Sequence, residues 1–204
     1  MNYSRTRQII GVTLVEILLA LTLFSLLGVL LVGFFRHSMW ALGRESLRLE
    51  LEQSNHFLLG KLAQTLQSSS LSGISYGSRD ENFVLAIHGI EDSTSDGALS
   101  WQDHLVGYFW SKDTTSLFLQ RIEPEPVGLR SRALKLHKGE LDLLGETIRE
   151  QGVLVSEKVS RFSVENLGEG GQGRLLRLTL GQQAQLEQAT RRTFVSELRI
   201  ALRN

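Results

Sequence analysis

The chain has 204 residues, enough for one domain of ordinary size with an appendage. Its 22 lysine and arginine residues balance 22 aspartate and glutamate residues, so no basic field is available for a nucleic acid. The absence of cysteine excludes disulfides, thiolate nucleophiles and cysteine-based zinc sites.

The first feature along the chain is an apolar run over residues 17–35, in which Thr22 and Ser25 are the polar side chains. At a rise of about 1.5 Å per residue, a helix of this length measures about 28 Å, close to the hydrocarbon thickness of a bilayer. A cleavable secretory signal has a shorter apolar region of about 7 to 15 residues. The run therefore predicts a membrane-spanning helix.

Glu16 stands at the N-terminal border of this apolar run. An acidic side chain at the centre of a membrane helix costs about 2.5 to 3.5 kcal/mol, and a partner cation relieves that cost. Two interpretations follow. The carboxylate caps the helix at headgroup level, near the positive end of the helix dipole, or it pairs with a cation from another molecule.

Residues 11–21, with the sequence GVTLVEILLAL, resemble the N-terminal processing signal of type IV prepilins and type II secretion pseudopilins. The resemblance implies that a prepilin peptidase cuts after Gly11 and methylates the new N-terminal residue, Val12, where the family usually has phenylalanine. It also implies that Glu16 pairs with the α-amino group of a neighbouring subunit. Arg5 and Arg7 in the leader favour a cytoplasmic N-terminus, although arginines also follow the span.

Beyond the span, apolar residues recur mostly at intervals of three, four or seven: Met39, Trp40, Leu47, Leu51, Leu58, Leu62 and Leu66. This periodicity predicts that the helix continues to about Gln67, where the serine-rich segment 68–73 interrupts it. The expected organisation is a leader over residues 1–11, the transmembrane half of the helix over 12–35, its extramembrane half over 36–67, and a mainly β head domain over 68–204.

From Phe83 onward, short segments rich in β-forming residues alternate with turns. The predicted strands cover residues 83–90, 105–111, 116–122, 132–137, 153–159, 161–166, 175–180 and 194–202. The clearest hairpin joins residues 106–110 to 117–119, and its alternating apolar side chains are expected to face the long helix. The predicted fold class is α+β, a long N-terminal helix packed on an antiparallel sheet, as in pilins.

The order of Tyr108, residues 119–121, residues 159–164 and residues 175–180 resembles the layout of the J-type minor pseudopilin. The resemblance implies a structural subunit at the tip or in the initiation complex of a type II secretion pseudopilus. Its expected location is the inner membrane, with a single span and the C-terminal domain in the periplasm or otherwise outside the cytoplasm. The implied partners are other minor and major pseudopilins, the prepilin peptidase, the inner-membrane assembly platform and membrane lipid. An alternative is a minor pilin of a type IV pilus or DNA-uptake system.

Two motifs suggest other activities. Residues 73–77 match the G-x-S-x-G nucleophile elbow, which makes a membrane-anchored hydrolase using Ser75 a remote alternative, although the required strand-to-helix context is missing. Gly168, Gly170 and Gly173 match a dinucleotide fingerprint, but the alternating leucines that follow predict a turn before a strand.

The five histidines lack metal-binding spacing, and the acidic residues Glu91, Asp92, Asp96 and Asp103 are expected in one polar loop without calcium-loop spacing. We therefore expect no enzymatic activity, cofactor or metal.

Overall fold

The computed structural model describes residues 13–93, 99–123, 133–168, 175–185 and 191–202. Its first element is the helix α1, Leu14–Gln67. The predicted C-terminal end of this helix is confirmed, whereas the predicted first residue, Val12, lies outside the described residues. The chain divides into two compact units within this helix, Met1–Ser46 and Leu47–Asn204.

The second unit contains the rest of the secondary structure. A short 3-10 helix, η1 (Leu71–Gly73), precedes the strands β1 (Ile74–Arg79), β2 (Asn82–Ser93), β3 (Leu99–Ser111) and β4 (Ser116–Ile122). The helix α2 (Lys138–Gln151) follows, and then the strands β5 (Val153–Ser156), β6 (Val159–Asn166), β7 (Leu175–Gln185) and β8 (Arg191–Ala201).

The strands form two antiparallel sheets. Sheet A has the order β1-β2-β3-β4-β5, and sheet B has the order β6-β7-β8. The predicted hairpin is confirmed, because Trp110 pairs with Leu117 and Ser111 with Ser116. The α+β fold class is confirmed as well: a long apolar N-terminal helix contacts antiparallel sheets, which is a pilin-like architecture.

The main core lies where the last turns of α1 meet both sheets. Leu58, Leu62 and Leu66 share one face of the helix and are almost fully buried. Sheet A contributes Phe83, Leu85, Ile87, Tyr108, Trp110 and Leu117, while sheet B contributes Val159, Phe162, Val164, Leu176, Leu178, Leu180 and Ile200. The indole Nε1 of Trp110 donates to the carbonyl oxygen of Val159 at 2.8 Å, which links the two sheets.

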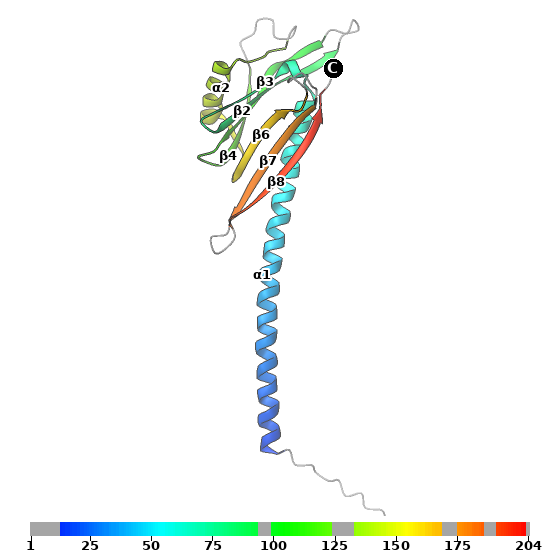
Figure 1. Ribbon diagram of the computed structural model, residues 1–204, viewed down its shortest axis with the longest axis vertical. Helices are drawn as coiled ribbons and strands as arrows, with labels where there is room; N and C mark the ends of the chain where they lie inside the picture. Colours follow the sequence, from blue (N-terminus) through cyan, green and yellow to red (C-terminus); the bar gives the residue numbers. More distant parts are fainter. Residues whose placement is uncertain (1–12, 94–98, 124–132, 169–174, 186–190, 203–204) are drawn as a thin grey trace, which may run out of the picture. The chain divides into compact units, whose positions relative to one another are not determined.

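The opposite face of sheet A is covered by α2, which the sequence analysis did not predict (Figure 1). Val84 and Phe109 alternate with the residues of the main core and pack with Leu141 and Ile148 of this helix. Sheet A is thus apolar on both faces, which explains the nearly continuous apolar run at the end of β3.

Two predicted strands differ from the structure. Residues 153–159 do not form one strand, because Lys158 has a left-handed backbone conformation (φ 61°) that separates β5 in sheet A from β6 in sheet B. Residues 133–137, predicted to lie in a strand over 132–137, have no regular secondary structure and lead into α2; residue 132 is not described. The structure also contains β1, which was not predicted because the sequence before Phe83 is rich in serine and glycine.

The packing of α2 depends on the missing side chain of Gly145. A Cβ atom there would lie 2.8 Å from Cγ2 of Val84, whereas a Cβ atom at Gly139 in the same helix would meet nothing within 4 Å. We expect Gly145→Ala to lower the free energy of unfolding by about 1 to 3 kcal/mol through overpacking. Gly139→Ala is the matched control and is expected to raise it by up to about 1 kcal/mol. Urea denaturation in detergent micelles measures both; equal effects of the two substitutions would contradict the close contact.

Candidate functional site

The first part of α1 is an apolar surface that the chain does not cover. An 18-residue window of this helix has a mean hydropathy of 2.7, and none of it is buried. Leu14, Phe24, Val29 and Phe35 are all more than 60% exposed. Such a helix is long and apolar enough to cross a membrane, which agrees with the predicted span.

The two polar side chains of the apolar run are satisfied within the helix. The hydroxyl of Thr22 donates to the carbonyl oxygen of Leu19, and that of Ser25 donates to the carbonyl oxygen of Leu21, both at 2.8 Å. These bonds leave neither hydroxyl dependent on water. Both residues are therefore compatible with a hydrocarbon environment.

Glu16 forms a capping box with Thr13 at the start of α1. The carboxylate Oε2 of Glu16 accepts hydrogen bonds from the backbone N–H of Thr13 at 2.9 Å and from its hydroxyl at 3.1 Å. In return, the backbone N–H of Glu16 donates to Oγ1 of Thr13 at 3.3 Å. Within one chain, the carboxylate thus occupies the capping position, which was one of the two interpretations of this residue.

Thr13 is a site residue that the sequence analysis did not single out. The spacing Thr-x-x-Glu immediately before an apolar run is the signature of a capping box, and it was present in residues 13–16. Gly11 and Val12, the predicted cleavage and methylation residues, lie outside the described part of the chain.

Trp40 lies shortly beyond the apolar run and carries a cation–π contact. The guanidinium carbon of Arg44 lies 3.1 Å from the centroid of the indole ring, one helical turn away. A tryptophan with an adjacent cation is typical of the membrane–water interface, where the ring contacts lipid and the charge contacts headgroups. The Trp40–Arg44 pair therefore lies where the apolar part of α1 is expected to end.

Ser75, the serine of the hydrolase alternative, lies in β1 and is 5% exposed. Its Oγ accepts a hydrogen bond from the backbone N–H of Leu136 at 2.9 Å. The residue follows a 3-10 turn and occupies a strand, so the strand-to-helix elbow required by the motif does not occur here. This environment supports a structural role for the hydroxyl.

The glycine-rich motif lies between two antiparallel strands. Residues 169–174, including Gly170 and Gly173, are not described, but β6 precedes them and β7 follows. A dinucleotide fingerprint needs a helix after the glycines, so the prediction of a connection between antiparallel strands is confirmed.

The acidic residues expected in one polar loop are distributed differently. Glu91 and Asp92 lie in β2 and Asp103 lies in β3, which corrects the loop prediction, while Asp96 is among the residues not described. Both strands extend further toward their connection than the turn residues suggested. Among the residues with described positions, no group of three or more metal-ligating side chains comes together.

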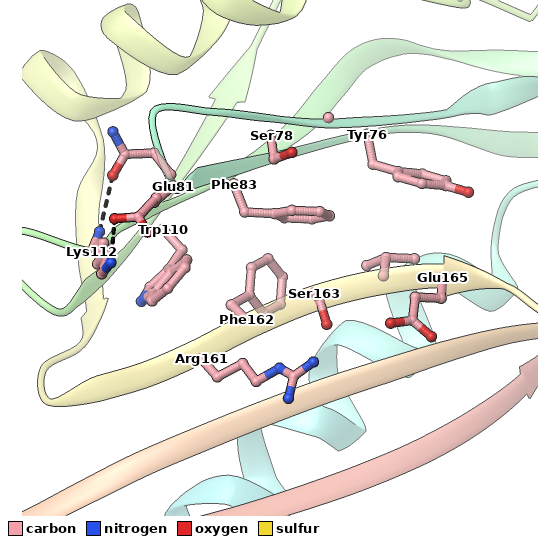
Figure 2. Close-up of a pocket in the computed structure, with 13 residues that line it drawn as sticks. Tyr76, Ser78, Glu81, Phe83, Trp110, Lys112, Arg161, Phe162, Ser163 and Glu165 are labelled. Carbon is pink, nitrogen blue, oxygen red and sulfur yellow. Dashed lines mark hydrogen bonds and ion pairs between the residues drawn. The ribbon is translucent and has the colours of Figure 1, made fainter.

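A groove of about 610 Å³ lies between the edge strands β1 and β6 (Figure 2). Rings of the main core, Phe83, Trp110 and Phe162, form part of its lining, and Lys112 is paired with Glu81. The lining contains serines but no histidine. The lining therefore offers these serines no imidazole base.

No family model, curated protein or solved structure matches this chain. The functional evidence consequently comes from the architecture and from the N-terminal part of α1. These are a pilin-like combination of helix and sheets, a helix segment able to cross a membrane, and a glutamate in the capping box at its start.

Proposed function

We propose that this chain is a minor pseudopilin, a non-enzymatic structural subunit of the tip or initiation complex of a type II secretion pseudopilus. The observation that carries the proposal is the apolar first part of α1, which is long enough to span a bilayer and is left uncovered by the chain itself. An uncovered apolar surface of this size needs lipid or other helices around it.

The second part of α1 supports the same proposal. Its leucines complete the core of both sheets, so the helix that would enter the membrane also forms part of the head domain. A subunit built in this way can exchange lipid contacts of its helix for contacts with neighbouring helices without refolding the head. This is the physical basis of filament assembly from a membrane pool.

The proposed location is the inner membrane, with a single span and the head outside the cytoplasm. The proposed partners are other minor and major pseudopilins, the prepilin peptidase, the inner-membrane assembly platform and membrane lipid. A minor pilin of a type IV pilus or DNA-uptake system is the second candidate, because the same N-terminus and the same pilin-like architecture support it.

Processing by a prepilin peptidase tests the proposal. When the full chain is co-expressed with an active peptidase, we expect the mature protein to begin at Val12, carry an N-methyl group and lack residues 1–11. We expect Gly11→Val to remain unprocessed, because the resemblance places a glycine immediately before the cut. Intact-mass spectrometry and N-terminal sequencing measure both outcomes.

Gly28→Val is the matched control, since Gly28 lies in the same apolar helix and a Cβ atom there would meet nothing within 4 Å. Its processing is expected to equal that of the unaltered chain. A wild-type product that still begins at Met1 beside an active peptidase would overturn the proposed function.

A further inference from the structure

His88 is a fully buried histidine whose two ring nitrogens both contact backbone groups. It lies in β2, stacks on Trp101 with ring centroids 5.1 Å apart, and has no exposed surface. Its Nε2 lies 2.7 Å from the carbonyl oxygen of Gln102, and its Nδ1 lies 3.0 Å from the backbone nitrogen of Leu134.

These two partners determine the protonation of the ring. The carbonyl oxygen of Gln102 can only accept, so Nε2 carries the hydrogen and donates it. The N–H of Leu134 can only donate, so Nδ1 must offer its lone pair and accept. The neutral Nε2–H tautomer is the one form of imidazole that satisfies both contacts.

The Nδ1 contact holds a segment that lacks regular secondary structure. Residues 133–137 lead directly into α2 and are tied to sheet A by two side chains, because the N–H of Leu134 donates to His88 and the N–H of Leu136 donates to Ser75. A proton added to the ring would occupy Nδ1 and face the Leu134 N–H, donor against donor. One of the two tethers would then be lost, and a buried charge would be created.

We propose that His88 is an acid-labile latch, which holds the Leu134 end of residues 133–137 on sheet A at neutral pH and releases this end when the imidazole is protonated. The latch is a property of the head domain and does not depend on the proposed function. It makes the attachment of the segment before α2 sensitive to the pH of the compartment that the head occupies.

The net effect of the groups around His88 is to lower its pKa, which favours the neutral ring. Burial lowers the pKa of His88 from its ordinary value of 6.5, the hydrogen bond to Gln102 opposes this shift, and His104 on β3 lowers the pKa further. Other charged or titratable groups lie on the elements around His88. Lys135 and His137 belong to the held segment, Asp103 pairs with His104, and β2 carries the exposed carboxylates of Glu91 and Asp92.

Two neutral hydroxyls complete these surroundings. The hydroxyl of Ser75 on β1 accepts from the held segment, and the hydroxyl of Ser69 donates to the carbonyl oxygen of His88.

The sign of the pH effect follows from this lowered pKa. The unfolded chain binds a proton near pH 6.5, whereas the native chain does so only at lower pH. The contribution of the neutral ring to stability is therefore complete above pH 6.5. It decreases as the pH falls from there through the folded-state pKa, and the segment is expected to open over the same interval.

A nitroxide label on Lys135→Cys tests the latch in the full chain in detergent micelles. Lys135 is exposed within the held segment, and the chain has no native cysteine, so the label attaches at one position. We expect an immobilised spectrum above pH 6.5 and a reversible loss of the immobilised component as the pH falls below this value. Asp113→Cys, in the exposed turn between β3 and β4, is the control position and is expected to give the same spectrum throughout.

Substitution of His88 tests whether this histidine, and not another titrating group, causes the pH dependence of the spectrum. In the Lys135-labelled chain, His88→Gln is expected to abolish the pH dependence of the spectrum, whereas His104→Gln and His137→Gln are expected to retain it. Two results would overturn the proposal: a transition that persists in His88→Gln, or a Lys135 label that becomes mobile only together with the Asp113 label, which would indicate global unfolding.

Discussion

Glu16→Gln is expected to abolish incorporation of the subunit into filaments while leaving cleavage after Gly11 largely intact. Glutamine preserves an oxygen that can accept the capping hydrogen bonds of Thr13 but removes the negative charge. If the neighbouring α-amino group needs a carboxylate partner, the unpaired charge costs about 3 to 5 kcal/mol, which corresponds to at least a hundredfold loss of assembly. Glu16→Ala is expected to fail to the same extent.

The capping box makes a matched control possible. Thr13→Val has nearly the same shape, keeps the carboxylate of Glu16 and removes the hydroxyl that takes part in the cap. Loss of a helix cap costs about 0.5 to 2 kcal/mol, so this variant is expected to assemble at a reduced but measurable level. Filaments sheared from cells that express each variant, quantified by immunoblotting after processing has been verified, measure the difference.

The opposite ranking would assign Glu16 to capping alone. If Glu16→Gln assembles normally and Thr13→Val does not, then the helix start, and not the charge, is what assembly requires. In the monomer, Oε2 of Glu16 already accepts two hydrogen bonds from Thr13, and an incoming amine would have to bind the same carboxylate.

Leu66→Ala is expected to lower the free energy of unfolding of the head by about 2 to 5 kcal/mol. Leu66 has no exposed surface and belongs to the core in which the last turn of α1 meets Leu85 of sheet A and Leu178 of sheet B. Removal of its side chain leaves a cavity that two sheets and a helix would all have to move to fill. Little relaxation is expected, which places the cost toward the upper part of the range.

Leu49→Ala is the control, because Leu49 lies in the same helix and is 50% exposed. Its effect is expected to stay within about 0.5 kcal/mol, as for other surface substitutions. Tryptophan fluorescence reports both variants during denaturation in micelles, since Trp101 and Trp110 are buried in the head. Equal destabilisation by the two substitutions would mean that the last turns of α1 are not part of the core.

Local patterns in the sequence predicted most of the elements correctly. The end of α1 at Gln67 follows from a loss of helical period at the serine-rich segment, and β4 has the predicted bounds of residues 116–122. The capped start of α1 was also encoded locally, in the Thr-x-x-Glu spacing of residues 13–16.

The helix α2 shows where such patterns were insufficient. Leu141, Leu144 and Ile148 have helical spacing, and Glu140 accepts from the N–H of His137 at 2.7 Å, as at a capped helix start. Gly139 and Gly145 disfavour a helix by intrinsic propensity. Gly145 is accommodated because Val84 and Phe109 of sheet A need the space, and that reason is invisible before the two elements are packed together.

By itself, the sequence determined the membrane-spanning capacity, the long helix, the strand alternation and the carboxylate at the helix start, because each depends on residues close together in the chain. The tertiary structure decided which strands share a sheet, that both faces of sheet A are covered, and that His88 joins Gln102 to Leu134. Those outcomes depend on contacts between residues far apart in sequence. A period of two specifies which side chains share a face of a strand but not which partner covers that face.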